Sequence, residues 1–405
     1  MIIPSILYKI SNKLATDYNT KSIIVGGAVR DHFLNNSIKD YDIEIYGLDK
    51  IKDLENTLKE YGSVNLVGKS FGVLKFNFEN KEYDFSFPRL ENKVSKGHRG
   101  FDVICDGNLE FKEASRRRDF TINAMGYNIE TKEFIDPFNG QYDIKNRLLR
   151  VVDSKTFIED PLRIYRAIQF SARFEYSLSE ETKILCKKMV KDKLLTELPK
   201  ERIYQELIKL LLKSKRPSIG FHLMNILEIE NSFNVKYIDK FLKLKTKNIE
   251  LNIKLSLATL CIGLGETKTK ELLYRFTNNH NLILSILNLL SYYTKPHHLY
   301  TNADIKKLAT KINISELVTL IKVDENNYKV GEWLLENAKI LNVENRPIKP
   351  LIQGQDLINL GLIPSPKFKD ILDKLYQTQL EKDIITKDEA IRYLKFYTSS
   401  NTTTC

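Results

Sequence analysis

The spacing of hydrophobic and polar residues changes along this 405-residue chain. Before residue 90, several short segments alternate apolar and polar positions, a period of two that is typical of strands with one buried face. Together with the apolar run SIIV, they predict a small mixed sheet. The predicted strands are residues 22–25, 41–47, 63–69, 71–78 and 81–88. Apolar residues at helical spacing predict two helices that pack against this sheet, over residues 1–20 and 49–61.

The later part of the chain has a helical period instead. Residues 154–174 contain an apolar stripe at helical spacing, made by Ile164, Ala167, Ile168 and Phe174. Pro161 is tolerated in the first turn of a helix, so we expect one long helix over this segment. Helical patterns with short loops also cover residues 198–345 and 354–395.

Candidate chemistry lies around the first predicted strand. Gly26 and Gly27 end it in a turn where backbone can approach a ligand closely. A helix should follow, and its free N–H groups would point back at the turn, which suits a phosphate. Around the next strand, the period of two puts Asp40, Asp42 and Glu44 on one face. Carboxylates on one face repel each other without a cation between them, so the pattern indicates metal-assisted phosphoryl or nucleotidyl transfer.

Two motifs in a set order are more specific than a glycine pair or an Asp-x-Asp alone. GGAVRD begins at Gly26 and is followed, nine residues on, by DYD at 40–42. This arrangement resembles the active-site signature of the nucleotidyltransferase superfamily, in particular its branch of bacterial-type tRNA CCA-adding enzymes and poly(A) polymerases. The segment RRDFTINA at 117–124 matches the motif of that family letter for letter. The resemblance is strong over 22–211, moderate over 350–395 and weak between them.

The resemblance implies an α+β fold, in which a small mixed-sheet nucleotidyltransferase head precedes an all-helical neck, body and tail. The implied parts are the catalytic head at 1–150, a base-selecting neck at 151–216, an RNA-binding body at 217–345 and a tRNA-binding tail at 346–405. In the neck, Glu201, Arg202, Glu206 and Lys209 are expected near the cleft.

The family also implies roles for individual residues. Asp40 and Asp42 are expected to be catalytic and to hold Mg²⁺. Asp84 and Glu44 are the candidates for a third catalytic carboxylate, and Asp84 is favoured because the family places an acidic residue on the later of their two strands. Arginines suit a nucleotide site, because their guanidinium groups bind phosphate oxygens with two parallel hydrogen bonds. The residues expected to bind the nucleotide are Gly26, Gly27, Arg30, Arg117, Arg118, Asp119, Asn123, Asp160, Arg163 and Arg166.

Asp160 and Arg163 are expected to choose the base. Their three-residue spacing would put them on one helix face, and EDPLR resembles the base-reading motif of the family. A carboxylate accepts from the amino group that cytosine and adenine share, and a guanidinium donates to the ring nitrogen beside it. Uracil and guanine present an oxygen in the place of that amino group, so the pair would reject both bases. An ordinary i,i+3 ion pair is the alternative interpretation.

Residues 88–100 are expected to form a mobile loop, because they contain charge and glycine and few apolar residues. The resemblance implies that this loop takes part in switching between nucleotides. Its basic residues are Arg89, Lys93, Lys96, His98 and Arg99.

The composition limits the classes of partner, metal site and cellular compartment that fit this chain. Lys and Arg number 63 against 52 Asp and Glu, and the formal charge of +11 favours a polyanion such as nucleic acid. The four cysteines contain no C-x-x-C pair, so neither a zinc site nor a disulfide framework is expected, and a reducing cytosol fits. No apolar run reaches about 18 residues, and the apolar stretch near the N-terminus is too interrupted for a signal peptide, so no membrane is expected. No protein partner is implied.

The expected activity is addition or repair of the 3′-terminal CCA of tRNA from CTP and ATP, without a nucleic acid template and with release of pyrophosphate. A poly(A) polymerase of the same family would share every catalytic residue. So would an enzyme that adds only CC or only the final A, because these activities differ in loop geometry. A non-catalytic RNA-binding protein is the alternative of another class, and the intact carboxylates and RRDFTINA argue against it.

Overall fold

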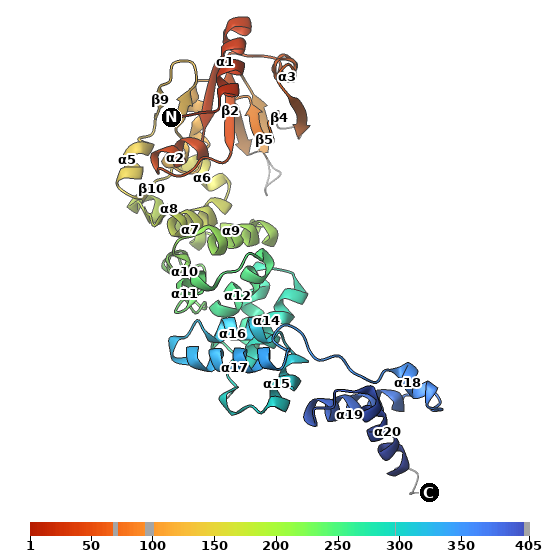
Figure 1. The fold of residues 1–405 in the computed structure, drawn as a ribbon. Helices are drawn as coiled ribbons and strands as arrows, with labels where there is room; N and C mark the ends of the chain where they lie inside the picture. The colour runs from red at the N-terminus through yellow and green to blue at the C-terminus, as the bar shows by residue number, and fades with distance from the viewer. Residues whose placement is uncertain (68–71, 94–100, 296, 401–405) are drawn as a thin grey trace. The chain divides into compact units, whose positions relative to one another are not determined.

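The computed structural model describes residues 1–67, 72–93, 101–295 and 297–400. It divides into two compact units, Met1–Asn231 and Ser232–Cys405 (Figure 1). A mixed sheet in the first unit, followed by helices, confirms the predicted α+β fold class. The finer division into head, neck, body and tail stays a prediction.

Within the described residues, the first unit is built around a sheet of seven strands that are not in sequence order. The order across the sheet is β3 (Ser63–Val67), β4 (Val73–Phe78), β5 (Lys81–Ser86), β2 (Tyr41–Tyr46), β1 (Lys21–Val25), β8 (Gly126–Asn128) and β9 (Phe134–Ile135). Neighbouring strands are antiparallel except β2 and β5, which run parallel. The five strands predicted from the apolar run and the alternating segments are therefore confirmed, while residues 68–69 and 71 of two of them lie outside the described residues.

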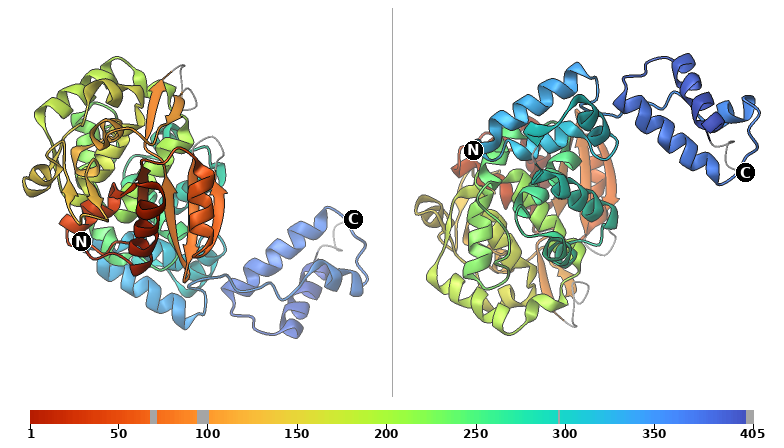
Figure 2. Two further views of the ribbon diagram at one scale, coloured as in Figure 1. Left: turned by 90° about the horizontal axis from the view of Figure 1, so that it is seen from above. Right: turned by 90° about the horizontal axis from the view of Figure 1, so that it is seen from below.

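One face of the sheet is a closed apolar layer. Ile24, Ile43 and Ile45 alternate to this face and are fully buried. Helices α1 (Ser5–Tyr18) and α3 (Ile51–Lys59) contact strands β1 and β3 (Figure 2). Both helices were expected from apolar spacing, and both are confirmed.

The opposite face carries the carboxylates. Its apolar cluster is formed by Ile23, Val25 and Tyr46 with Phe111 and Ala114 of α4 (Phe111–Arg116). Because side chains alternate along β2, Asp42 and Glu44 point to the same face as Tyr46. The polar part of this face therefore begins where the apolar cluster ends.

Two strands beside the sheet correct one expectation. β6 (Arg89–Lys93) pairs antiparallel with β7 (Phe101–Cys105), so a loop over the whole of 88–100 is wrong. The backbone of this charged segment obtains its hydrogen bonds from a partner strand that its own composition does not reveal. Lys96, His98 and Arg99 lie outside the described residues.

Helices dominate the rest of the first unit. The remaining α-helices and strands described are α2 (Gly27–Phe33), α5 (Gly140–Lys145), α6 (Ser154–Glu159), α7 (Leu162–Phe174), α8 (Glu180–Lys191), α9 (Lys200–Lys213), α10 (Pro217–Ile226) and the short parallel pair β10 (Leu148–Leu149) and β11 (Ser177–Leu178). The single long helix expected over 154–174 is wrong, because the chain breaks between α6 and α7. Asp160 is extended there, with φ −119° and ψ 94°, since the residue before a proline avoids the helical region.

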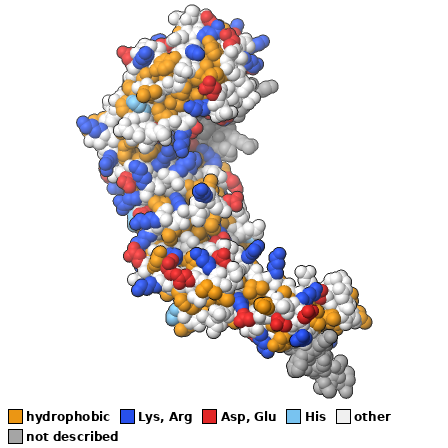
Figure 3. Space-filling model, in the orientation of Figure 1, with side chains coloured by type: hydrophobic (Ala, Val, Ile, Leu, Met, Phe, Trp, Pro, Cys, Tyr) orange, Lys and Arg blue, Asp and Glu red, His pale blue; other side chains and the backbone are white. Residues whose placement is uncertain are grey.

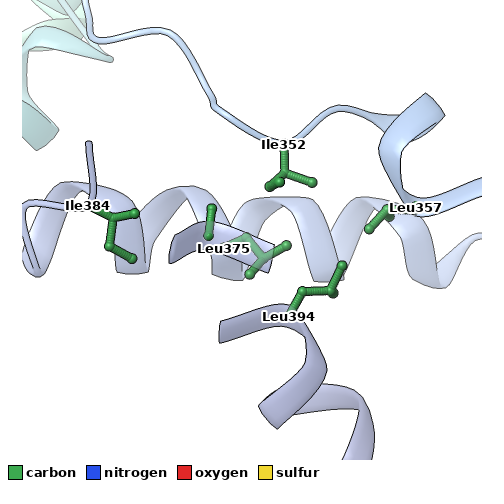
Figure 4. Packing of buried hydrophobic residues seen from close by; sticks show 6 residues of the cluster. Ile352, Leu357, Leu375, Ile384 and Leu394 are labelled. Atoms are coloured by element: carbon green, nitrogen blue, oxygen red, sulfur yellow. The ribbon is translucent and has the colours of Figure 1, made fainter. Parts of the chain in front are cut away.

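The second unit is helical throughout its described secondary structure. Its α-helices are α11 (Ile238–Phe241), α12 (Ile249–Leu260), α13 (Glu266–Phe276), α14 (His280–Tyr293), α15 (Asn302–Ala309), α16 (Ile314–Ile321), α17 (Tyr328–Ile340), α18 (Gly354–Asn359), α19 (Lys367–Glu381) and α20 (Lys387–Ser400). The last three helices and the segments beside them enclose a small core of their own, which includes Ile352, Leu357, Leu375, Ile384 and Leu394 (Figure 4).

Two features bear on the setting of the protein. In the described part of the chain, no helix combines the length and apolar character that crossing a membrane requires. Cys186 and Cys261 are buried free thiols, and burial raises the pKa of each to about 12. Both thiols are therefore protonated and unreactive at neutral pH.

Gly140→Ala should destabilise the first unit. A Cβ at this position would overlap the carbonyl oxygen of Thr121 and lie 2.8 Å from Cγ of Met125. Overpacking of this kind costs about 1–3 kcal/mol in the free energy of unfolding. Gly354→Ala is the control, because nothing lies within 4 Å of a Cβ there. Chemical denaturation followed by circular dichroism measures both variants, and unchanged stability of Gly140→Ala would contradict the packing.

Candidate active site

One cavity of the first unit, about 680 Å³ in volume, brings most of the predicted site residues together. Its lining is Gly26, Gly27, Arg30, Asp40, Asp42, Arg118, Asp119, Asn123, Asp160, Arg163, Arg166, Arg173 and Lys209. Of the residues predicted to be catalytic or to bind nucleotide, Asp84 and Arg117 are not part of this lining. Lys and Arg side chains gather where the sheet of this unit meets its helices (Figure 3).

The glycine turn after β1 has a conformation that glycine adopts easily and other residues do not. Gly26 has φ +67° and ψ −122°, where an L side chain is strained. A Cβ on Gly26 would also lie 2.9 Å from Nη1 of Arg118 and 4.0 Å from Oδ2 of Asp42. Helix α2 begins at the next residue. The turn therefore brings free backbone, a guanidinium and a carboxylate to one part of the cavity wall.

The candidate catalytic carboxylates lie on or next to two neighbouring parallel strands. Asp42 of β2 is directly opposite Asp84 of β5, and Asp40 comes just before β2. Asp42 is exposed as a residue, but burial of its carboxyl group raises its pKa; Arg118 opposes this shift, and neighbouring carboxylates reinforce it. Oδ1 of Asp84 is buried without a hydrogen-bond partner, 3.7 Å from Nζ of Lys75. A cation would relieve this crowding of negative charge.

These carboxylates fit a divalent cation that shares its coordination with a substrate. Among the residues the structure describes, no group of three His, Cys, Asp or Glu side chains is arranged to hold a metal ion. Asp40 and Asp42 line the cavity as a pair. Hard cations such as Mg²⁺ are often held by one or two carboxylates, with waters and substrate phosphates completing the coordination. The donor set therefore suits a cation bound together with a polyphosphate.

Glu44 shares the strand face of Asp42 but has different partners. It is 3% exposed, and its carboxylate accepts hydrogen bonds from Oη of Tyr46 at 2.8 Å and Nη2 of Arg118 at 3.0 Å. Nη2 of Arg117 lies 3.6 Å from the same carboxylate. Burial and the charge of Glu44 raise the pKa of Tyr46, so its hydroxyl stays a donor. Glu44 is therefore a positioning residue for Arg118, while the choice of a third catalytic carboxylate stays a prediction.

A buried network joins the RRDFTINA segment to α2 and α7. Oδ2 of Asp119 accepts from Nε of Arg166 at 2.7 Å, and Nη2 of the same guanidinium lies 2.7 Å from it in an ion pair. Its Oδ1 accepts from the side chain of Asn123 at 2.9 Å, and Asn123 accepts from Nη1 of Arg30 at 2.6 Å. Burial alone would raise the pKa of Asp119, but the charge of Arg166 and these hydrogen bonds lower it. Asp119 therefore stays ionised and holds Arg166 at the cavity.

Asp160 and Arg163 both line the cavity, but the expectation that they share a helix face is wrong, because Asp160 lies in the break before α7. The carboxylate of Asp160 accepts from Nη2 of Arg202 at 3.1 Å. Arg163 donates to the backbone carbonyls of Thr156 and Arg117, both at 2.6 Å. Each side chain is therefore held by a different element of the fold.

Two further cations line the cavity. Lys209 does so from α9, and its Nζ donates to Oε1 of Glu206 at 2.7 Å. The neck motif predicts Lys209 near the cleft, but Arg173 is missed. The sequence pattern that could have predicted Arg173 is helical spacing, because Arg173 lies seven residues after Arg166 and Arg163 lies three before it. One face of a helix presents all three arginines.

Two family models match the first unit. Residues 22–150 match the model described as "Poly A polymerase head domain", and residues 175–229 match "Probable RNA and SrmB- binding site of polymerase A". The first match contains the sheet, the glycine turn and the RRDFTINA segment.

Curated relatives extend the similarity along the chain. The multifunctional CCA protein of Haemophilus ducreyi is 32% identical over 348 residues, which are 80% of this chain and 79% of that protein. The CCA-adding enzyme of Francisella tularensis subsp. novicida is 29% identical over 389 residues, 90% of this chain and 99% of that enzyme. Against several other multifunctional CCA proteins, matched at higher identity, the chain spans about half of their length, 44–47%.

A solved structure has the same fold. The Bacillus stearothermophilus CCA-adding enzyme in complex with CTP matches with a TM-score of 0.74 and 21% identity, over 98% of both chains. Identity this low carries the fold alone, whereas the relative from Haemophilus ducreyi matches in sequence over most of both proteins. The chain therefore belongs to the family of CCA-adding nucleotidyltransferases.

Proposed function

We propose that this protein adds or repairs the 3′-terminal CCA of tRNA from CTP and ATP, without a nucleic acid template and with release of pyrophosphate. The observation that carries the proposal is one cavity in which the glycine turn, Asp40 and Asp42 lie with Asp160, Arg163 and further arginines. Relatives named for CCA addition support it. We also assign the reaction to the cytoplasm, the compartment that the unpaired, buried cysteines fit.

The triphosphate of the incoming nucleotide would bind at the glycine turn. Gly26 allows phosphate oxygens to approach the backbone, and Arg118 donates to them from the side of the turn. Glu44 holds Arg118 before the substrate arrives, so little reorganisation is needed as charge develops on the leaving pyrophosphate. Arg166, held by Asp119, adds a second oriented guanidinium.

Asp40 and Asp42 would hold Mg²⁺ beside this triphosphate, and their shared position at the start of β2 supports the assignment. A Mg²⁺ pair held there would supply activation of the 3′-hydroxyl of the tRNA and charge stabilisation for the pyrophosphate that leaves the α-phosphate. Asp84 is the proposed third carboxylate, because it lies directly opposite Asp42 on the neighbouring strand and its Oδ1 has no hydrogen-bond partner.

Base choice is assigned to Asp160 and Arg163. Arg202 orients the carboxylate, and two backbone carbonyls orient the guanidinium, so both groups have a set direction before a base arrives. An acceptor beside a donor matches the edge that cytosine and adenine have in common. The net charge of +11 supports binding of the tRNA through its phosphates and shape.

A poly(A) polymerase is the second candidate, because residues 22–150 match the head domain described by that name. The deciding experiment incubates the purified protein with tRNAs that end before the first C, after CC, or complete, supplying one nucleotide at a time. CCA addition predicts CTP incorporation into the first tRNA, ATP incorporation into the second and none into the third. CTP or ATP alone would be used by a CC-only or an A-only enzyme, and long A tails on complete tRNA would indicate a poly(A) polymerase. No incorporation at all would indicate a non-catalytic RNA-binding protein.

Asp40→Asn and Asp42→Asn should each abolish Mg²⁺-dependent nucleotide addition and leave tRNA affinity nearly unchanged. Loss of a partner behind a metal ligand already costs about 10–100-fold, so loss of a direct ligand should cost more than about a hundredfold. Asp192→Asn, an exposed carboxylate on the same unit, is the control. Single-turnover incorporation and a tRNA binding assay make the comparison, and near-normal turnover in either variant would refute the metal assignment.

Glu44→Gln should lower kcat/KM for the nucleotide by about 10–100-fold, because hydrogen bonds to charged groups are worth about 1.5–3 kcal/mol. The neutral amide no longer balances Arg117 and Arg118, so Arg118 leaves the glycine turn. Tyr46→Phe is the matched control: it removes one hydrogen bond to Glu44 and keeps both arginines, so a smaller effect is expected. A rise in KM for CTP with an unchanged melting temperature indicates a role in positioning, whereas a lowered melting temperature indicates a role in folding. Equal kinetics of Glu44→Gln and the parent would exclude this role.

Replacing both Asp160 and Arg163 with alanine should reduce discrimination more than rate. The variant loses the groups that pair with C and A, together with the repulsion of Asp160 against the oxygens of U and G, while the carboxylates of β2 are untouched. Incorporation of each of the four nucleotides is compared with the parent. The control is Glu180→Ala with Lys183→Ala, an i,i+3 ion pair of 3.6 Å on α8. A full preference for C and A in the first variant would mean that base selection lies elsewhere.

A further inference from the structure

A second cavity of the first unit, about 220 Å³ in volume, is lined almost entirely by the ends of three helices. Its residues are Leu34, Asn36, Arg173, Phe174, Lys213 and Lys215, from the end of α2, the end of α7 and the end of α9. Arg173 also lines the cavity of about 680 Å³ that contains Asp40 and Asp42, here called the catalytic cavity, so one guanidinium belongs to both cavities.

Within the described residues, the cations of this second cavity lack the ion-paired carboxylate that Arg166 has in the catalytic cavity. In the part of the chain that the structure describes, Arg173, Lys213 and Lys215 form no ion pair, whereas Arg166 in the catalytic cavity is paired with Asp119. Burial lowers the pKa of Arg173, and the nearby charge of Arg30 lowers it further, against the opposing effect of Asp31. Three positive charges without an ion-paired carboxylate would be stabilised by an anion from outside the protein.

The end of helix α9 accounts for only part of this arrangement. A cation in the last turn of a helix is stabilised by the helix dipole, which explains Lys213. Lys215 lies beyond the helix, and Arg173 comes from a different helix. The guanidinium of Arg173 also lies 5.1 Å from the ring centre of Phe174, which, with Leu34, gives the cavity an apolar wall. A phosphate next to a ribose or base edge matches both parts of this lining.

We propose that this second cavity binds a backbone phosphate of the RNA strand, close to the 3′ end that enters the catalytic cavity. The proposal rests on the proposed function. The incoming nucleotide already has the glycine turn and Arg118 for its phosphates and Asp160 with Arg163 for its base. The RNA strand is the remaining phosphate-bearing substrate, and the shared Arg173 connects its cavity to the reaction. Arg173, Lys213 and Lys215 are therefore all expected to contact RNA. Because the two lysines line only the second cavity, they are expected to contact RNA and not the incoming nucleotide.

The test is Lys213→Met with Lys215→Met in the full chain, which removes two exposed charges and keeps the aliphatic stems. The matched control is Lys187→Met with Lys188→Met, two exposed lysines of α8 with the same change of charge. For a tRNA ending in CC, we expect KM for the tRNA to rise at least tenfold in the first pair, with kcat and KM for ATP unchanged. The slope of log affinity against log salt should fall by about 0.7 for each phosphate that the variant no longer binds. The control should change neither quantity.

Three results would overturn the proposal. Equal weakening by both pairs would mean general attraction of RNA to a basic protein. A rise in KM for ATP with unchanged tRNA affinity would mean that the cavity takes a nucleotide phosphate instead. No change in either constant would mean that the lysines are ordinary surface residues. Direct tRNA binding is measured in parallel, so that a parent protein without activity would refute the proposed function while the binding data still decide the role of this cavity.

Discussion

The buried carboxylate of Glu44 is the group on which the geometry of the catalytic cavity depends. A buried charge is costly unless it is paired and hydrogen-bonded, and Glu44 obtains both from Arg117, Arg118 and Tyr46. The dependence is mutual, because the same pairing keeps Arg118 beside the glycine turn. A Cβ on Gly26 would lie 2.9 Å from Nη1 of Arg118, so a side chain at the turn would displace the guanidinium that Glu44 holds.

Two carboxyl groups in this cavity have pKa values shifted in opposite directions, and the difference separates their roles. Asp42 has a raised pKa, through burial and neighbouring carboxylates, against the effect of Arg118. Asp119 is also buried, but Arg166 and Asn123 lower its pKa. Asp119 is therefore satisfied within the protein and acts by holding Arg166. Asp42 is left with excess negative charge around it, which is the condition under which a cation binds.

Local signals in the sequence predicted five strands and the glycine turn, because a period of two or a glycine pair needs only neighbours in the chain. Most of the arginines of the cavity, and Asp160, were predicted from the resemblance to a family. Contacts between distant segments were out of reach. The partners of Glu44 depend on how the RRDFTINA segment folds over β2. The sequence could therefore place Glu44 on one face of the strand but could not show that two arginines pair with its carboxylate. Strand β6 could not be predicted without its partner strand β7. The role of Arg173 in the lining of both cavities depends on the position of α7 in the fold.

The break at Pro161 is the expectation whose failure is most informative about base selection. In a continuous helix over 154–174, Asp160 would be one more side chain of the helix interior. Because the break makes Asp160 extended, its Oδ1 accepts from the backbone N–H of Leu162 at 3.2 Å, while its carboxylate also receives Arg202 of α9. The start of α7 carries free N–H groups and partial positive charge, which stabilise a carboxylate at this point. Asp160 is thus oriented by two helices at once, and its direction toward the cavity does not depend on a substrate being present.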